Sequence, residues 1–474
     1  MEILFVASET FPLAKVGGLA DVTSSLAIAL HDLGHEPCLI LPKYRSIKTA
    51  VQDIQGEDVV VSFMGHHEQV GLKMTRLKKR VPVYLVENDA YFGTEEIYGQ
   101  GELERFFFFS LIIPAVISRL DIHPDIVHCH DWHTSLVPLW LRQAKISLPC
   151  VFTIHNLAYQ GSFDQNFLLR SGLSSLWQEY IPVSAPRPSL NFMSQGIMLA
   201  DILTTVSPTY ASEILTAQYG NGLEELLDYR RHDLYGIVNG IDYDEYNPAT
   251  DASLETNYDS STIERKIGNK LALQEKSGLP QDSEVPLFGM VSRLDDQKGI
   301  DLLLQAIDTF IGETRAQLVI LGEGREHYHK SLAEAASRHP ERLSVVIARD
   351  ERLARLIYAG SDVFLMPSRF EPCGLGQLIA MRYGAVPVVR HTGGLADTVK
   401  DVAETDGNGF VFQNYAASEM LEAMKRAEES FYHGVEWQDL MRRNMKLDFS
   451  WKASASKYEE IYLRAQNMSQ HYQA

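Results

Sequence analysis

The sequence predicts an α/β protein with two doubly wound, Rossmann-like domains that face each other across a cleft. Short apolar runs rich in Val, Ile and Leu alternate with helical patterns, which is typical of parallel sheets covered by helices on both faces. The chain has 474 residues, too many for one ordinary hydrophobic core. The pentapeptide Gly-Gly-Leu-Ala-Asp follows an apolar run at residues 17–21 and again at 393–397, which indicates a similar loop in each half.

Several of the predicted strands are continuous apolar runs, as expected for strands buried on both faces. In the first half they are Ile3–Ala7, Pro37–Leu41, Val59–Phe63, Val83–Val86, Ile126–Cys129, Val151–Ile154, Ile202–Val206 and Gly236–Val238. In the second half they are Leu287–Val291, Gln317–Leu321, Ser344–Ile347, Val363–Met366, Val386–Val389 and Phe410–Phe412. The longest apolar run, 106–117, is interpreted as a buried helix because it is too short to cross a bilayer.

The two domains are predicted to cover residues 1–240 and 241–450. The boundary is placed at the dipeptide Asn239-Gly240, a pair typical of turns, which a polar stretch follows. The remaining residues, 451–474, have the spacing of an amphipathic helix. We expect that helix to pack back on the first domain.

Composition excludes some classes of partner. The formal net charge of −19 argues against nucleic acid and against anionic membrane surfaces. The first residues enter a predicted strand directly, with no targeting segment. A cytoplasmic protein is therefore expected, or one of the plastid stroma if a transit peptide has been removed. Four cysteines in this length fit a reducing compartment.

Two motifs resemble metal sites, and neither is interpreted as one. His128-Cys129-His130 lies on a predicted strand, where neighbouring side chains point to opposite faces and cannot easily share an ion. Asp242-Tyr-Asp244 matches the Asp-x-Asp of many sugar transferases, but it lies in the predicted connection between domains. We interpret it as turn chemistry and expect no bound metal.

Chemistry-bearing residues follow predicted strands, whose carboxyl ends meet at one edge of a parallel sheet. In the first half, Lys15, Gly17 and Gly18 combine a positive charge with glycines that let a backbone approach an anion. Two later strand ends carry residues that could surround a sugar, with Trp132 as a stacking face. These residues are Asp131, Trp132, His133, His155 and Asn156.

In the second half, Arg293 and Lys298 follow the first strand of the domain, where they could clamp a diphosphate and stabilise a leaving phosphate. For an isolated Arg and Lys, solvated surface charge would be the better interpretation; the position at a strand end favours function. Glu371, Cys373 and Gly374 lie at a strand-to-helix turn, where backbone N–H groups meet a carboxylate and a thiol.

Together these motifs resemble the bacterial glycogen synthases and plant starch synthases, which are retaining glucosyltransferases. The most specific stretches are the Lys15-x-Gly-Gly-Leu19 start and Phe370-Glu-Pro-Cys-Gly-Leu375, and the resemblance covers nearly the whole chain. It implies a GT-B fold with the active site in the cleft between the domains. It also implies that glucose passes from ADP-glucose to the non-reducing 4-hydroxyl of an α-1,4-glucan, with no metal and no cofactor beyond the donor.

The resemblance also implies roles for single residues. The residues expected to bind the donor phosphates and nucleotide are Lys15, Arg293 and Lys298, the backbone loops Gly17, Gly18, Gly393, Gly394 and Leu395, and Asn239 at the hinge. Those around the transferred glucose are His155, Asn156, Glu371, Cys373 and Gly374. Those on the acceptor side are Asp131, Trp132, His133 and Tyr91. The implied catalytic set is Glu371, His155, Arg293, Lys298 and Asp131.

The chain departs from the family pattern at two places near the donor. Gly376 stands where the family usually has Thr, and Ala348-Arg349 stands where it usually has Gly-Tyr beside the base, so a preference for UDP-glucose stays open. Two other functions also stay open. One is a GT-B glucosyltransferase with a small acceptor such as a sugar phosphate, and the other is a non-catalytic glucan-binding homologue.

Overall fold

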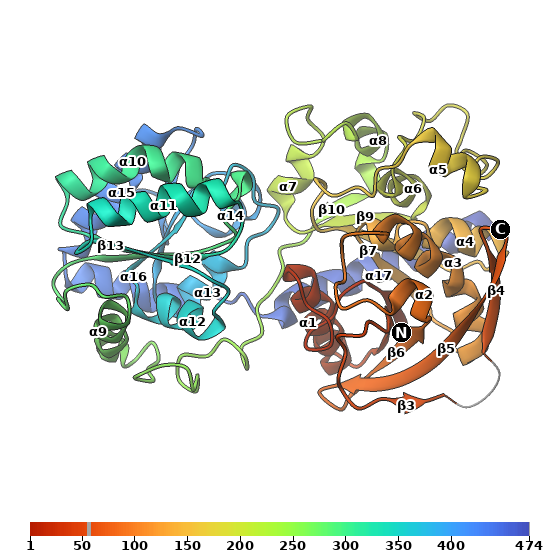
Figure 1. Ribbon diagram of the computed structural model, residues 1–474, viewed down its shortest axis with the longest axis horizontal. Coiled ribbons are helices and arrows are strands. Elements are labelled where there is room, and N and C mark those ends of the chain that lie inside the picture. The colour runs from red at the N-terminus through yellow and green to blue at the C-terminus, as the bar shows by residue number, and fades with distance from the viewer. Residues whose placement is uncertain (55–57, 474) are drawn as a thin grey trace. The chain divides into compact units, whose positions relative to one another are not determined.

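The computed structural model describes residues 1–54 and 58–473 (Figure 1). The chain forms two compact units. The first consists of Met1–Asn239 together with the C-terminal residues from Trp451, and the second of Gly240–Ser450. The first unit thus ends one residue before the predicted limit at residue 240. Residue 474, the last of the predicted C-terminal helix, lies outside the described part of the chain.

The first unit is built on one large sheet with the order β10-β9-β8-β7-β1-β2-β6-β5-β3, and β4 pairs with β5. Its strands are β1 (Glu2–Val6), β2 (Glu36–Pro42), β3 (Gln52–Asp53), β4 (Val59–Phe63), β5 (His66–Leu77), β6 (Val81–Glu87), β7 (Ile126–His130), β8 (Cys150–Ile154), β9 (Ile202–Thr205) and β10 (Leu234–Gly236). The run from β10 to β6 is parallel, whereas β5 is antiparallel to both neighbours. The strand order reverses between β1 and β7, so ligands are expected at the carboxyl ends of these two strands.

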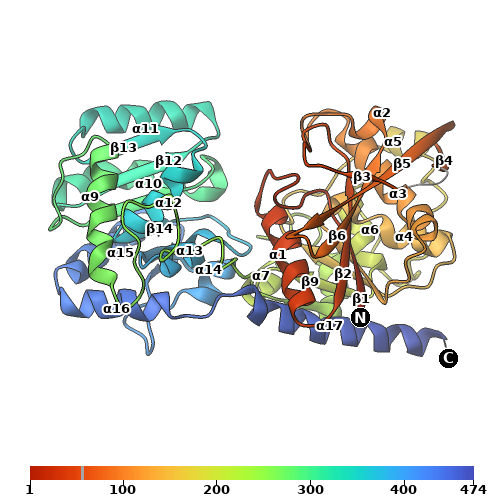
Figure 2. The same cartoon turned by 90° about the horizontal axis from the view of Figure 1, so that it is seen from below.

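Helices cover both faces of this sheet (Figures 1 and 2). They are α1 (Gly18–Asp32), α2 (Asp89–Phe92), α3 (Glu102–Leu120), α4 (Val137–Gln143), α5 (Gln165–Arg170), α6 (Phe192–Leu199), α7 (Pro208–Glu213), α8 (Glu224–Tyr229) and α17 (Trp451–Gln473). The buried helix predicted over 106–117 is α3, whose phenylalanines 106–109 are all in the core. The C-terminal helix α17 packs along α1 and reaches β7 and β8, where the Tyr462 hydroxyl hydrogen-bonds Nδ1 of His128 at 2.8 Å.

The second unit has a six-stranded parallel sheet with the order β13-β12-β11-β14-β15-β16. Its strands are β11 (Leu287–Val291), β12 (Gln317–Gly322), β13 (Leu343–Ile347), β14 (Val363–Met366), β15 (Val386–Arg390) and β16 (Phe410–Phe412). Its helices are α9 (Lys266–Lys276), α10 (Ile300–Glu313), α11 (Glu326–Arg338), α12 (Glu351–Gly360), α13 (Gly376–Arg382), α14 (Gly393–Thr398), α15 (Ala417–Phe431) and α16 (Val435–Met445). This is the doubly wound order, with its switch point between β11 and β14.

Three strands of the first unit differ from the prediction, and one of them is the two-residue β3, which was not predicted. β5 was not predicted, because its sequence is polar and its residues alternate between buried and exposed, as in an antiparallel strand with one solvated face. The strand predicted at residues 236–238 is β10, which instead covers Leu234–Gly236. The parallel strands were predictable because they are buried on both faces and therefore continuously apolar.

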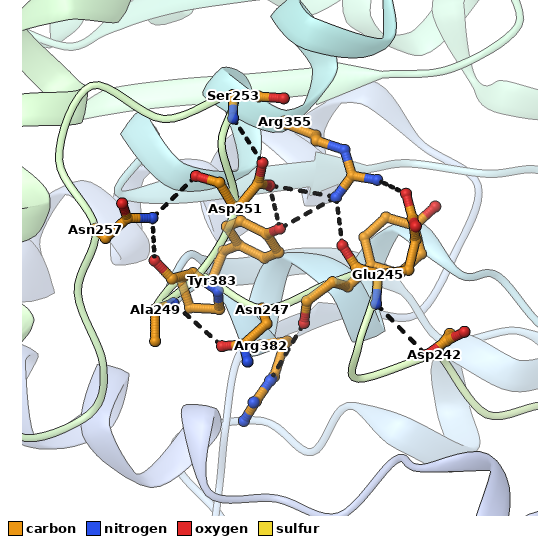
Figure 3. A network of polar contacts seen from close by, with 12 residues as sticks. Asp242, Glu245, Asn247, Ala249, Asp251, Ser253, Asn257, Arg355, Arg382 and Tyr383 are labelled. Carbon is orange, nitrogen blue, oxygen red and sulfur yellow. Dashed lines mark hydrogen bonds and ion pairs between the residues drawn. The ribbon is translucent and has the colours of Figure 1, made fainter.

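The connection that enters the second unit is held by polar contacts (Figure 3). The Asp242 carboxylate accepts the backbone amides of Asp244 at 2.9 Å and Glu245 at 3.4 Å, as in an Asx turn. The Asp-Tyr-Asp motif therefore caps its own turn, in agreement with the sequence interpretation. Further along, Asp251 accepts the Tyr383 hydroxyl at 2.6 Å and pairs with Arg355 of α12 at 3.2 Å.

Arg355→Ala is expected to destabilise the second unit by about 3 kcal/mol, because it leaves the buried Asp251 carboxylate without its cation. The same change removes a 2.7 Å bond to the Glu245 carbonyl. Chemical denaturation measures the effect. Arg352→Ala, an exposed position on the same helix, is the control and should change stability by less than about 0.5 kcal/mol. Equal effects at the two positions would contradict a structural role for the network.

Candidate active site

In the first unit, a buried acid organises the loop that follows β1. One oxygen of the Glu9 carboxylate accepts the backbone amides of Val16 at 2.5 Å and Gly17 at 3.0 Å. The other accepts the hydroxyl of Tyr98. The Gly17 amide, which the resemblance assigned to the donor, is therefore already bonded within the protein. Gly18 is the first residue of α1, where helix geometry offers its amide no intrahelical acceptor.

Lys15 lies on this loop and is half-buried. Its Nζ pairs with the Asp21 carboxylate at 2.8 Å and lies 5.1 Å from the centre of the Phe11 ring. A single surface pair of this kind contributes little to stability. The lysine can therefore exchange its partner for a more highly charged anion at small cost.

Asp131 stands at the end of β7 in a strained conformation. Its φ is +57°, a region that residues other than glycine rarely adopt. Its Oδ1 accepts the backbone amides of His155 at 2.7 Å and Asn156 at 3.4 Å, so it fixes the end of the neighbouring strand β8. Burial is the main cause that raises the pKa of this carboxyl to about 7.

Histidines fill the same strand ends in their neutral form. Burial lowers the pKa of the half-buried His155 to about 3. Nε2 of its ring hydrogen-bonds Nδ1 of His130 at 3.0 Å. His133 is buried and stacks on Tyr98 with ring centres 4.9 Å apart, and burial holds its pKa well below the ordinary value. An uncharged imidazole can hydrogen-bond a sugar without bringing a charge to it.

Trp132 is placed differently from the prediction. The indole of Trp132 is 4% exposed and packs edge-on against Phe106, and a Cβ added at Gly161 would lie 2.2 Å from it. It is therefore mainly a packing residue and not an open stacking face. The ring of Tyr91 likewise packs on Phe108, with ring centres 4.5 Å apart.

A cavity of about 600 Å³ lies beside the Trp132 edge. Its lining includes Glu102, Glu104, Gln160 and Tyr159, whose ring is 52% exposed. Aromatic faces beside polar groups are suited to a carbohydrate. The sequence analysis missed Tyr159, although it follows the predicted site residues His155 and Asn156 by only a few positions.

In the second unit, the structure brings the predicted residues of β11 and β14 together. The half-buried Lys298 pairs with the buried Glu371 carboxylate, with Nζ 2.6 Å from Oε2. The same carboxylate oxygen accepts the Ser368 hydroxyl at 2.8 Å. Arg293 is more exposed; it pairs with Asp295 at 2.8 Å and donates to Gln297 at 3.1 Å. Two cations, each paired with a carboxylate, thus lie near the switch point of this sheet.

The paired glycines of α14 let two backbone segments touch. A Cβ at Gly393 would lie 2.0 Å from the carbonyl oxygen of Glu371, and one at Gly394 would lie 2.1 Å from that of Cys373. The Gly394 amide donates to the Glu371 carbonyl at 3.0 Å, and the Leu395 amide donates to Thr392 at 3.1 Å. These two amides are thus bonded inside the protein. They help to shape the Glu371 loop, and the donor-binding role that the resemblance implies for this segment stays a prediction.

The remaining predicted residues have local roles. Cys373 is buried, and its carbonyl accepts the Gln377 amide at 3.0 Å. Gly374 has a φ of +74°, which favours glycine, and a Cβ there would lie 2.4 Å from Gln377. Asn239 is the last residue of the first unit before the connection, and its buried Oδ1 has no hydrogen-bond partner among residues 1–54 and 58–473.

Sequence reasoning missed several residues that hold the site. Glu9 could have been suspected as an acid directly after an apolar strand and before a glycine loop, and Ser368 as a hydroxyl within the Glu371 motif. Gln297 could likewise have been suspected as an amide between Arg293 and Lys298, whereas Tyr98 has no comparable sequence feature. Throughout the described part of the chain, no group of three or more His, Cys, Asp or Glu side chains could hold a metal ion. Over the same residues, no helix is long and apolar enough to cross a membrane.

The sequence of the chain is similar to those of known glycosyltransferases. A family model described as the starch synthase catalytic domain matches residues 2–229, and one described as glycosyl transferases group 1 matches residues 272–439. The chain is 45% identical to the glycogen synthase of Geotalea daltonii over 98% of each chain. It is 44% identical to glycogen synthase 2 of Geobacter sulfurreducens over 98% of this chain and 99% of that one. The chain belongs to the glycogen and starch synthase family.

A solved structure of a family member agrees in fold. The catalytic domain of starch synthase IV from Arabidopsis thaliana, bound to ADP and acarbose, matches with a TM-score of 0.90 and 34% identity over 98% of this chain and 99% of that chain. The two parallel α/β sheets in separate domains are the GT-B architecture of glycogen and starch synthases. Sucrose-phosphate synthase from Thermosynechococcus elongatus, at a TM-score of 0.61 and 17% identity, shares the fold alone.

The departure from the glycogen and starch synthase pattern at Gly376 has a steric explanation. Gly376 is the first residue of α13, and a Cβ there would lie 3.1 Å from Sδ of Met366 and 3.2 Å from the Phe364 ring. A threonine side chain at this position would press on these two side chains, which would have to shift by a few tenths of an ångström. Arg349, the other departure, is exposed between β13 and α12.

Gly376→Thr, which restores the usual family residue, is therefore expected to lower stability by about 1 to 3 kcal/mol through overpacking. Thermal unfolding measures it. Gly312→Ala is the control, because that helical glycine has open space around its Cβ position and should gain about 0.5 to 1 kcal/mol. An unchanged or higher melting temperature for Gly376→Thr would show that steric crowding does not explain the departure.

Proposed function

We propose that this protein transfers glucose from ADP-glucose to the non-reducing end 4-hydroxyl of an α-1,4-glucan, with retention of the anomeric configuration. The observation that carries the proposal is the Lys298–Glu371 pair, with Arg293 near it, at the switch point of the second unit. Full-length identity to glycogen synthases supports the reaction. The starch synthase IV domain bound to ADP and acarbose supports a nucleotide and a glucan as ligands.

The second unit supplies the groups for the donor. Arg293 and Lys298 bind the two phosphates and stabilise the negative charge that grows on the departing ADP. Glu371 is held by Lys298 and Ser368, and it orients the glucose and offsets positive charge on the sugar ring. Cys373 and Gly374 shape the turn around that sugar.

The first unit supplies the groups for the glucose and the acceptor. His155 and Asn156 contact the transferred glucose, and Asp131 fixes both through their backbone amides. Lys15 leaves Asp21 to bind a donor phosphate. The cavity lined by Tyr159, Gln160 and Trp132 takes the glucan, and the ring of His133 packs against Trp132. Tyr91 keeps the acceptor-side role that the resemblance implies.

The proposed step is an attack from the side on which ADP departs. The bond between C1 of glucose and the phosphate oxygen breaks, and a bond forms between C1 and the acceptor 4-oxygen. The proton of the acceptor hydroxyl passes to the departing phosphate. Lys298 and Arg293 lower the barrier because they bind the leaving group more strongly as its charge develops. We further propose that the protein acts in the cytoplasm, as the resemblance to bacterial enzymes implies.

Labelled glucose incorporation tests this proposal. The wild-type protein is incubated with maltopentaose or glycogen and either ADP-glucose or UDP-glucose, each labelled in the sugar. We expect glucan labelling from ADP-glucose at well above the rate from UDP-glucose. A clear preference for UDP-glucose would overturn the donor assignment. Transfer to glucose 6-phosphate or fructose 6-phosphate instead of glucan would overturn the acceptor assignment.

A further inference from the structure

We propose that His130 is a positioning residue that fixes the tautomer of His155, so that the Nδ1–H of His155 is the hydrogen-bond donor offered to the substrate. The inference rests on the proposed function, in which His155 contacts the transferred glucose. It starts from the 3.0 Å hydrogen bond between Nδ1 of His130 and Nε2 of His155. Each ring carries one proton when neutral, so only one of these nitrogens can be the donor.

His130 is held in a fixed position inside the first unit. Its side chain is fully buried on β7. The ring stacks on Phe5 with centres 5.4 Å apart and planes inclined by 13°, and its other neighbour, His128, has its ring centre 4.1 Å away. His128 in turn is bonded at both nitrogens, to Tyr462 at 2.8 Å and to Thr153 at 2.6 Å. Burial and the stack on Phe5 thus hold the His130 ring, and the nitrogen it presents to His155, in one orientation.

The surroundings of His130 decide the direction of the bond. Its Nε2 is buried and has no hydrogen-bond partner in the part of the chain that the structure describes. If His155 donated, neutral His130 would carry its proton on this Nε2, as a buried N–H without an acceptor. If His130 donates from Nδ1, Nε2 keeps only a lone pair. A buried N–H without an acceptor is rarer in proteins than a buried acceptor without a donor. His130 therefore donates from Nδ1, and His155 accepts at Nε2.

The His155 proton must then lie on Nδ1. That nitrogen makes no hydrogen bond to any other residue within 1–54 and 58–473, and the ring is half-buried, so Nδ1–H is available to an acceptor oxygen of the substrate. Burial keeps the ring neutral at physiological pH, as its lowered pKa indicates. β7 thus fixes His155 twice, through Asp131 at the backbone and through His130 at the ring. His155 acts as an oriented neutral donor and not as a general acid or base.

Nitrogen NMR tests the tautomer without reference to activity. The full-length protein is labelled with ¹⁵N-histidine, and His155→Gln identifies the His155 signals in a two-bond ¹H–¹⁵N correlation spectrum. We expect Nδ1 to be protonated and Nε2 unprotonated at pH 7. Protonation on Nε2, or an equal mixture of tautomers, would overturn the proposal. This measurement decides even if a variant at position 130 fails to fold.

Kinetics of two substitutions test the consequence. His130→Phe keeps the ring packing but removes both nitrogens. It is expected to lower kcat for glucan synthesis by about tenfold to a hundredfold, with the KM for maltopentaose within about twofold. His130→Asn places an amide near the Nδ1 position and should recover part of the loss. An unchanged kcat in folded His130→Phe would overturn the proposal.

Tyr462→Phe is the matched control, because it removes a hydrogen bond from the other histidine on the same face of β7. We expect the His155 tautomer and kcat to stay at the wild-type values; losses equal to those of His130→Phe would indicate a general packing effect and overturn the positioning role. Failure of the proposed function would give a different result from failure of the positioning role. In that case the wild-type protein makes no glucan from either nucleotide sugar, while the NMR spectrum still reports the tautomer.

Discussion

Replacing Glu371 with alanine is expected to lower turnover by about 10²- to 10³-fold and to change ADP-glucose affinity by less than about tenfold. The reason is that the carboxylate acts on charge that develops at the sugar during transfer, while Arg293 and Lys298 supply most of the attraction for the phosphates. Steady-state kinetics with saturating glucan, together with calorimetric titration of the donor, separate the two quantities. Equal losses in turnover and affinity would contradict this role.

Ser368→Ala is the matched control for that substitution. It removes one hydrogen bond to Glu371 but leaves the 2.6 Å pair with Lys298 intact. We expect a loss in turnover of about tenfold or less, because the carboxylate keeps both its charge and its pair with Lys298. A loss as large as that of Glu371→Ala would mean that the orientation of the carboxylate matters more than its charge.

Substitution of Asp131 should have the second large effect. Asp131→Ala removes the acceptor that holds the amides of His155 and Asn156, and we expect a fall in kcat of about 10²-fold or more from the loss of positioning. Asp131→Asn keeps an acceptor oxygen and should retain more activity than alanine. Asp131→Gly relieves the positive φ without restoring the acceptor. If it were as active as wild type, the bonds to β8 would not matter.

Stability should also depend on pH through Asp131. Burial raises its pKa to about 7 in the folded protein, whereas an unfolded aspartate titrates near pH 4. The folded state therefore binds the proton more tightly. The stabilisation that this provides is fully present below about pH 4 and is lost as the pH rises through about 7. The free energy of unfolding should differ by on the order of 4 kcal/mol between these two limits.

Asp131→Asn removes this titration. The difference in unfolding free energy between wild type and Asp131→Asn should therefore fall from pH 4 to pH 7 and then level. Denaturation at several pH values, followed through a probe in the first unit, measures that difference. A difference that stays constant or rises over this range would contradict the raised pKa.

Much of the fold could be predicted because its strands are buried on both faces. Such strands must be continuously apolar, and thirteen of the fourteen predicted runs lie within one residue of a strand's ends or well inside it, with residues 236–238 the exception. β5 could not be found in this way, since an antiparallel strand at the solvated part of a sheet carries polar residues on one face. β5 therefore differs from the predicted parallel strands in its environment, and the other missed strand, β3, has only two residues, both exposed.

The sequence predicts which residues of the candidate site follow each strand, but it does not predict how their side chains and backbone amides pack. Residues after β11 and β14 were expected together, because parallel strand ends converge, and the Lys298–Glu371 pair follows from that rule. The sequence could not predict that the Trp132 indole is covered, because the covering residue, Gly161, lies far along the chain. Likewise, no sequence pattern shows that the amides of Gly394 and Leu395 are hydrogen-bonded to the carbonyls of Glu371 and Thr392.

The most direct test of the account is a ¹H NMR time course of wild-type protein with ADP-glucose and maltopentaose. We predict that α-1,4 anomeric signals grow as the α-linked glucose of the donor disappears, with one ADP released for each glucose added. This outcome would establish donor, acceptor and retention in a single experiment. Growth of β-linked signals, or loss of ADP-glucose to free glucose without glucan elongation, would contradict it.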